Sequence, residues 1–361
     1  MAAYIFRRLL LIIPTLFGIM VINFAIIQFI PGGPVEQALA NLENLGAEFD
    51  RLGGSAGDAG MASADSDSAY QGRIGLSEDF IADLEKQYGF DKPVATRFWL
   101  MMKSYLVFDF GESFFRSISV VDLIIEKLPV SITIGLWSTL ITYMVSIPLG
   151  IRKAIRDGSK FDTWTTTALI VASSIPQFLI AIVLIVLFAG GSFWQWFPLR
   201  GLTSSNFDEL SLWGQVKDYF WHISLPVISM SIGGFTGLVL LTKNSFLDEI
   251  KKQYVTTARA KGCTERRVLY GHVFRNSMLI VVAGFPSLFV GLFFAGSLII
   301  ETIFSLDGLG RMGFEAVVAR DYPIIFGTMY FGGLVGLLVK ILSDITYTWI
   351  DPRIDFESRR V

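Results

Sequence analysis

The sequence predicts an all-α membrane protein with six transmembrane helices, and three observations support this fold class. Of its 361 residues, 52% are hydrophobic and only 17% are charged, whereas roughly a quarter are charged in a typical soluble domain. The apolar residues come in long blocks, without the periodicity of an amphipathic helix or strand. Lys and Arg also gather in alternate connections between these blocks, as in chains that cross a membrane.

Six apolar runs are long enough to span a bilayer, which takes about 20 predominantly apolar residues in a helix. They are 9–30, 129–151, 164–189, 223–241, 278–300 and 323–342. Within lipid only helices and closed barrels pair every backbone group, and these runs are too long for barrel strands. A cleaved signal peptide is the alternative for the first run, with a weak A-x-A site at Ala38 and Ala40. Its long apolar core favours a retained span.

The distribution of cations predicts that both termini are cytoplasmic. The short connections on the opposite side carry only Arg200, Lys217, Arg311 and Arg320. The remaining clusters are Arg7 and Arg8, Arg152 to Lys160, Lys243 to Arg275, and Arg353 to Arg360. Two termini on one side require an even number of spans, and six satisfies this.

The spans divide the chain into four parts. Residues 1–30 form the cytoplasmic start and the first span, and residues 31–128 form a periplasmic segment. Within that segment, 35–75 is rich in Gly, Ala, Ser and Asp and is expected to be mobile, whereas 77–107 is expected to form amphipathic helices. These helices are expected to lie on the membrane or on the other spans, and a docking surface for a soluble partner is the alternative. A five-helix core (129–350) and a cytoplasmic tail (351–361) complete the chain.

Several classes of site are disfavoured by the residues present. Cys263 is the single cysteine, and the two histidines, His222 and His272, lack partners at metal-ligand spacing, so neither a disulfide nor a metal site is expected. The net charge of -2 gives no indication of nucleic-acid binding. The middles of the runs hold no ionisable residue, but they do hold neutral polar residues. The candidates for lining a cavity are Asn23, Gln28, Gln177 and Thr236, and hydrogen bonding between helices is the alternative role for each.

The connection 243–276 is the most distinctive segment. It holds eight Lys and Arg against three Asp and Glu, an excess that cytoplasmic connections commonly show. Gly262 is expected to end a helix, and a second amphipathic helix is expected to lead into the next span. The small residues Thr257, Ala258 and Ala260 would let a partner surface approach closely.

The run Tyr-Val-Thr-Thr-Ala-Arg-Ala-Lys-Gly at 254–262, followed by His272 and Arg275-Asn276, resembles the coupling loop of ABC importer permeases, in particular their dipeptide/oligopeptide branch. The resemblance extends over nearly the whole chain and looks most like the Yej-type permeases, whose family role is uptake of oligopeptides and peptide antibiotics such as microcin C. It implies a type I ABC importer permease core and a short helix that docks on an ATPase subunit. That helix would comprise Tyr254, Thr257, Ala258, Arg259, Ala260, Lys261 and Gly262. The chain departs from the general motif, with Thr256-Thr257-Ala258 in place of Glu-Ala-Ala.

Partners follow from what the chain lacks. No Gly-Lys pair occurs in it, so a phosphate-binding P-loop is absent and the ATPase must be another chain, which would bind ATP and Mg. The resemblance implies one or two ATPase subunits, a second and non-identical permease, a periplasmic peptide-binding protein and the bacterial inner membrane. The chain itself is therefore expected to be a multi-pass transport subunit and not an enzyme.

Asp307, Gly308 and Gly310 lie in an outer connection and are candidates for a periplasmic gate, with an ordinary turn as the alternative. The rival function is a proton-coupled secondary peptide transporter, which the neutral interiors of the spans disfavour. A membrane protease is disfavoured because neither histidine lies at mid-depth in a predicted span.

Overall fold

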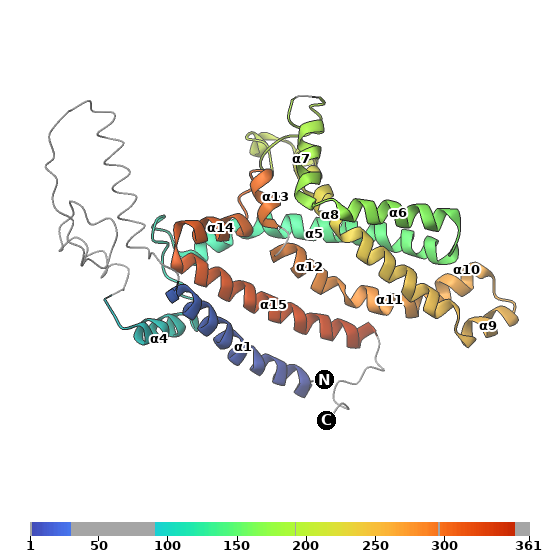
Figure 1. The fold of residues 1–361 in the computed structure, drawn as a ribbon, viewed down its shortest axis with the longest axis horizontal. Helices are drawn as coiled ribbons and strands as arrows, with labels where there is room; N and C mark the ends of the chain where they lie inside the picture. Colours follow the sequence, from blue (N-terminus) through green and yellow to red (C-terminus); the bar gives the residue numbers. More distant parts are fainter. Residues whose placement is uncertain (1, 30–90, 192, 295–296, 351–361) are drawn as a thin grey trace. The chain divides into compact units, whose positions relative to one another are not determined.

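The computed structural model describes residues 2–29, 91–191, 193–294 and 297–350. These residues are mainly helical, and the only strand-like feature among them is a single bridge between Glu112 and Ser119 (Figure 1). The longer helices are α1 (Ala2–Phe29), α4 (Val94–Tyr105), α5 (Val120–Ile155), α6 (Lys160–Ser174), α7 (Gln177–Phe188), α8 (Leu212–Ile250), α11 (Phe274–Ala283), α12 (Phe285–Phe294), α14 (Leu309–Ala319) and α15 (Tyr322–Ile350). The shorter ones are η1 (Phe207–Glu209), α9 (Gln253–Ala260), α10 (Glu265–Arg267), the π-helix η2 (Val268–Val273) and α13 (Ser297–Ile303).

Five helical segments are long and apolar enough to cross a membrane, and the bent pair α6–α7 gives a sixth if it is counted as one span. The five are Tyr4–Phe29, Val120–Ile155, Leu212–Ile250, Glu265–Gly291 and Tyr322–Thr346. The predicted all-α membrane class is therefore confirmed. The predicted mobile stretch 35–75, the first part of the predicted amphipathic helices and the tail 351–361 lie outside the described residues. Helix α4 lies within the stretch predicted to be amphipathic.

The third span differs from its prediction, because the expected continuous helix over 164–189 is broken. Helix α6 ends at Ser174, α7 begins at Gln177, and the two are bent by 92°. Pro176 has no N–H to donate to a helix, and its ring disfavours the helical conformation at the preceding residue. Accordingly Ile175 is extended, with φ -84° and ψ 124°.

The fifth span also differs from its predicted range of 278–300. The apolar segment observed runs over Glu265–Gly291, through α10, η2, α11 and into α12. Hydropathy alone placed its start too late, because the polar residues before Met278 are helical as well. They are held there by Val268 and Val273, which are fully buried in the core.

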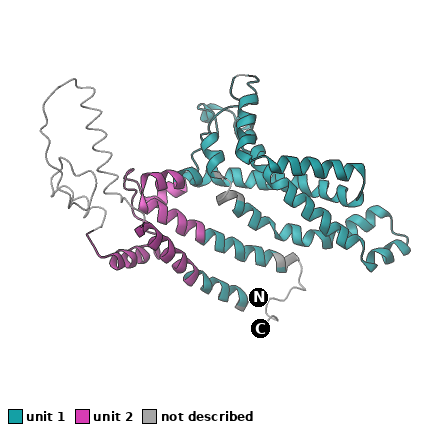
Figure 2. Ribbon diagram, in the orientation of Figure 1, with its two compact units in different colours: residues 1–13, 127–312, 334–361 teal, residues 14–126, 313–333 magenta. Residues whose placement is uncertain are grey.

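The chain divides into two compact units (Figure 2). Unit 1 comprises residues 1–13, 127–312 and 334–361 and holds two apolar cores. One core joins α5, α8, α9, η2 and α11 around Phe246, and the other joins α5, α7, α8 and α13 around Met230. Helices α5 and α8 approach closely at Gly150, where a Cβ would lie 2.6 Å from Thr242 Cβ. A glycine is therefore required at this crossing.

Unit 2 comprises residues 14–126 and 313–333 and is packed largely by aromatic rings. Phe24 contacts Phe98 of α4 and Phe326 of α15, and Tyr105 contacts Phe110 and Tyr330. A pocket of about 300 Å³ lies among these residues. Burial raises the pKa of the Tyr105 phenol above its usual range, with the nearby Asp109 carboxylate adding to the shift.

Candidate functional site

The segment that resembles a coupling helix forms α9, and its sequence explains both ends. The helix begins after Lys252, which is extended with φ -74° and ψ 149°. At the other end Gly262 has φ +78°, which glycine adopts without steric cost. Gly262 N donates to Arg259 O at 2.9 Å, and Cys263 N donates to Ala258 O at 3.2 Å. These two bonds make a Schellman motif, which satisfies the carbonyl groups left free at a helix end.

Two apolar residues of α9 attach it to unit 1. Val255 is fully buried and Ala258 is 9% exposed, and both belong to the core around Phe246. The small side chain of Ala258 therefore faces this core, whereas those of Thr257 and Ala260 are exposed. On α9 the exposed residues are Gln253, Thr256, Thr257, Arg259 and Ala260, and Lys261 and Gly262 just after the helix are exposed as well, while Tyr254 is half-buried.

Polar contacts hold α9 at both ends. Arg259 forms an ion pair with Glu265 of α10, with Nε 2.8 Å from Oε1, and both side chains are exposed. Tyr254 donates its hydroxyl hydrogen to Glu249 Oε2 of α8 at 2.7 Å. Burial and the Glu249 carboxylate raise the pKa of the Tyr254 phenol, so this hydroxyl keeps its proton near neutral pH. Helix α9 is thus tied to α8 before it and to α10 after it.

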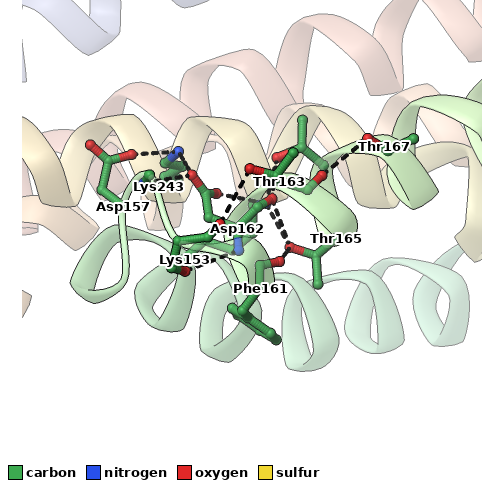
Figure 3. Close-up of polar contacts among 11 residues, drawn as sticks. Lys153, Asp157, Phe161, Asp162, Thr163, Thr165, Thr167 and Lys243 are labelled. Atoms are coloured by element: carbon green, nitrogen blue, oxygen red, sulfur yellow. Dashed lines mark hydrogen bonds and ion pairs between the residues drawn. The ribbon is translucent and has the colours of Figure 1, made fainter.

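An ionic cluster lies on the α8 segment that leads to α9 (Figure 3). Lys243 Nζ lies 2.8 Å from Asp157 Oδ1 and 2.7 Å from Asp162 Oδ2. Asp157 lies in the turn between α5 and α6, and Asp162 lies in the first turn of α6. Asp162 Oδ2 also accepts from the backbone N–H of Gly158 at 3.2 Å. The cluster therefore ties α8 to the α5–α6 turn.

Lys153 of α5 completes the cluster from inside the protein. Its side chain is 0% exposed, and Nζ lies 2.9 Å from Asp162 Oδ1. It donates to Asp162 O and to the hydroxyl groups of Thr165 and Thr166 at 2.6–2.8 Å. A buried ammonium group is costly unless it is paired and hydrogen-bonded, and here it is both. Asp162 thus serves two lysines from two different helices.

The four predicted cavity residues fall in different units. Asn23 and Gln28 belong to unit 2, where Gln28 lines the pocket and accepts a hydrogen bond from Arg97 at 3.1 Å. Gln177 and Thr236 belong to unit 1. Thr236 donates to Leu169 O of α6 at 2.8 Å, which is the helix–helix role. Gln177, the first residue of α7, lies beside Gly233 of α8, and its buried Nε2 has no hydrogen-bond partner among the described residues.

The predicted gate residues lie together in unit 1, at the start of α14. Asp307 forms an ion pair with Lys127 of α5. Gly308 is buried and Gly310 is half-buried. Within the part of the chain that the structure describes, no group of three His, Cys, Asp or Glu side chains could hold a metal ion.

Comparison with known proteins identifies the class of this chain. The family model described as "Binding-protein-dependent transport system inner membrane component" matches residues 146–356, which include α9 and the ionic cluster. The chain belongs to this family. It is 60% identical over 364 residues to the peptidoglycan transport system permease protein YejB of Agrobacterium fabrum, covering 100% of both chains. It is 57% identical to the inner membrane ABC transporter permease protein YejB of Escherichia coli O157:H7, covering 99% of this chain and all of the relative. Identity to the oligopeptide transport system permease protein AppB of Bacillus subtilis is 30%, again over 99% and 100% of the two chains.

This binding-protein-dependent permease is thus a multi-pass protein of the bacterial inner membrane and the membrane-spanning subunit of an ABC importer, as the sequence predicted. The resemblance to Yej-type permeases is confirmed as well. Subunits of this family are transport components and not themselves enzymes.

Sequence reasoning did not identify Lys153, Asp162 or Glu301 as site residues of this permease. The charges near 153–162 were interpreted only as orientation signals. Lys243 and Asp162 are 81 residues apart, and Ser131 and Glu301 are 170 apart. No local pattern links such distant pairs, so a single sequence carries no signal for them.

Proposed function

We propose that this permease imports peptides in a complex with separate ATPase subunits, a second and non-identical permease and a periplasmic peptide-binding protein. One relative is named for oligopeptide transport and another for peptidoglycan transport. Both substrate names share peptide chemistry, and peptide antibiotics such as microcin C belong to the same class of solute. In this assembly the ATPase subunits, carried on one chain or two, bind ATP and Mg, and both termini of the permease are cytoplasmic.

The contact with the ATPase, called the joint below, is the exposed face of α9 with the adjoining Lys261. The observation that supports this role most is the combination of a buried side with an exposed cationic side on one short helix. Val255 and Ala258 fix α9 to the core, while Arg259 and Lys261 remain exposed. A push on the exposed side is therefore transmitted to α8 and α11 through packed side chains. ATPase closure would move α9, and the spans would respond by alternating access.

Reversing the charges of Arg259 and Lys261 to Glu tests this joint. We expect ATP-driven peptide uptake to fall by about tenfold or more, because like charges across a docked interface cost several kcal/mol. The chain should still insert into the membrane, since both side chains are exposed. The measurement is uptake of a labelled peptide by proteoliposomes that contain the assembled transporter.

The matched control reverses Arg200 and Lys217, two exposed cations of unit 1 outside the coupling segment. This control should retain near wild-type uptake. Normal uptake in the Arg259 and Lys261 variant would contradict the assignment. For the wild type, uptake that survives ATP depletion and stops when the proton gradient is collapsed would instead support a secondary transporter.

A further inference from the structure

A carboxylate is buried beside the predicted gate residues. Glu301 lies in α13, within unit 1, and is 0% exposed. Burying a charged group costs free energy unless hydrogen bonds replace its water. A carboxylate thus occupies a position where an apolar residue would be simpler to bury, and its contacts show which segments it connects.

Glu301 connects three helices through one serine and two backbone groups. Ser131 Oγ of α5 donates to Glu301 Oε1 at 2.9 Å and accepts from Leu309 N at 2.9 Å. Arg311 N donates to Glu301 Oε2 at 2.8 Å. We call these four groups the Glu301 clasp: the side chains of Ser131 and Glu301 and the N–H groups of Leu309 and Arg311. Since Leu309 and Arg311 lie in the first turn of α14, the clasp caps this helix from neighbouring elements.

Gly308, the residue before α14, leaves room for the Glu301 carboxylate because it has no side chain. A Cβ added to Gly308 would lie 2.3 Å from Glu301 Oε1 and 2.4 Å from its Cδ. Real Cβ atoms do not approach other atoms so closely, so residue 308 must lack one while the carboxylate stays in place. Glycine is therefore required here by the position of Glu301 and not by backbone conformation.

Helix α5 grips the same segment at a second point. Lys127 forms an ion pair with Asp307, whose side chain is 57% exposed. Lys127 and Ser131 are four residues apart on α5 and so lie on one face of it. Residues 307–311 are thus held to α5 by two buried side chains, and one of these, Lys127, pairs with a carboxylate that is exposed to solvent.

We propose that Glu301 is a positioning residue for transport, which holds residues 307–311 against α5 and so keeps the outer gate closed until ATP drives it open. The inference rests on the proposed function. The contacts of the Glu301 side chain are hydrogen bonds. Such bonds are lost once donor and acceptor separate beyond about 3.5 Å, and they form again when the two groups return. A clasp of this kind can open and close in each cycle, whereas a packed apolar contact changes more gradually with displacement.

The test uses the complete transporter in proteoliposomes and measures two quantities, ATP hydrolysis without binding protein and peptides imported per ATP hydrolysed. ATP-dependent uptake by the wild type is established first, and its failure would refute the proposed function alone. In Glu301→Ala we expect peptides per ATP to fall about tenfold, the usual consequence of losing a charge-assisted hydrogen bond. The rate of ATP hydrolysis without binding protein should rise, because a gate without the clasp can open before the complete transport cycle has taken place. Glu301→Gln keeps the shape and one acceptor, and should restore part of the coupling.

A double-mutant cycle separates the clasp from a general packing role. Gly308→Ala should lower the coupling ratio, whereas Gly313→Ala, within α14, should not, because a Cβ there meets no atom within 4 Å. In the Glu301→Ala background the added cost of Gly308→Ala should largely disappear, because the colliding carboxylate is gone.

Three outcomes would overturn the proposal: wild-type coupling in Glu301→Ala, fully additive effects of the two substitutions, or equal effects of Gly308→Ala and Gly313→Ala. If Glu301→Ala does not assemble, Ser131→Ala decides the matter, since it removes the bridging hydroxyl from α5 and leaves Glu301 in place. Unchanged coupling in Ser131→Ala would then refute the proposal.

Discussion

Gly262 is the residue at which local backbone chemistry and the proposed joint meet. Its φ of +78° lies in the left-handed region, and the Schellman bonds to Arg259 and Ala258 depend on that conformation. The exposed cations Arg259 and Lys261 lie within the three residues before it. The direction in which the chain leaves α9, and hence the exposed face, depends on this one glycine.

Substituting Gly262 tests that dependence. Gly262→Ala should destabilise the protein by about 1–2 kcal/mol, the usual penalty for a left-handed non-glycine residue. Gly262→Asn should cost less, because Asn tolerates this region better. Thermal unfolding in detergent provides the comparison, with Gly271→Ala as control, since a Cβ there would come no closer than 3.8 Å to Arg267 Cγ. Equal effects at Gly262 and Gly271 would contradict this reasoning.

Single residues were predictable where the signal was local. Gly262 was expected to end a helix, because glycine after a cationic helical stretch is a common stop. The burial of Ala258 was not predictable, because its small size fits a partner surface and a packed core equally well. Glu301 comes directly after the predicted span 278–300, and nothing near it in the sequence indicates Ser131 or the start of α14.

At the scale of elements, the ionic cluster decides how α8 is held to the α5–α6 turn. Asp162 forms ion pairs with two lysines, Lys153 and Lys243. Removing the aspartate therefore has a different effect from removing either lysine. Removing Lys153 leaves Asp162 paired with Lys243, whereas removing the Asp162 charge leaves the buried Lys153 without a carboxylate partner among the described residues. Lys243 retains Asp157 in either case.

Asp162→Asn should therefore lower the free energy of unfolding by about 3 kcal/mol or more, as for other broken buried pairs. Lys153→Met should lower it by less. Asp157→Asn is the control, because its side chain is 51% exposed and exposed pairs contribute about 0–1 kcal/mol. Adding Lys153→Met to Asp162→Asn should recover stability, since no unpaired buried charge remains. Thermal unfolding of the four variants measures this order, and a double variant worse than Asp162→Asn would refute it.

Elements were predictable to the extent that apolar length determines them. Each predicted span overlaps a helix, but helices α5 and α8 run well beyond their apolar runs because packing holds their polar ends. The break at Pro176 had a local signal, which the continuous hydropathy of 164–189 concealed. Proline does occur within the helical segments at positions 129, 148 and 226, so its presence alone did not decide where a helix would break.

At the scale of the whole molecule, the sequence was sufficient for the class and the family. Composition and long apolar runs indicated a helical membrane protein, and the 254–262 run indicated the type of transporter. The contacts that complete the sites could not be predicted from the sequence, because they join residues far apart in the chain, such as Lys243 with Asp162 or Ser131 with Glu301. Such contacts depend on how the helices pack together, which one sequence does not encode locally.

The cation distribution makes a topological prediction for the whole chain. A fluorescent protein fused to the carboxyl terminus should fluoresce, and alkaline phosphatase fused there should be inactive, because both report a cytoplasmic position. The same two reporters inserted near Arg200, between α7 and α8, should give the reverse result. An active phosphatase at the carboxyl terminus would contradict the orientation and would place α9 on the wrong side for an ATPase.

The shortness of α9 has a consequence for attempts to block the joint. With eight residues it extends only about 12 Å, and isolated helices below about 12–15 residues are marginal in water. Its shape is imposed by Val255, Ala258 and the flanking helices, so a free peptide copying 253–262 would be mostly unfolded. A competitor for the proposed contact with the ATPase would therefore need a rigid scaffold of its own, such as a staple or a grafted helical hairpin.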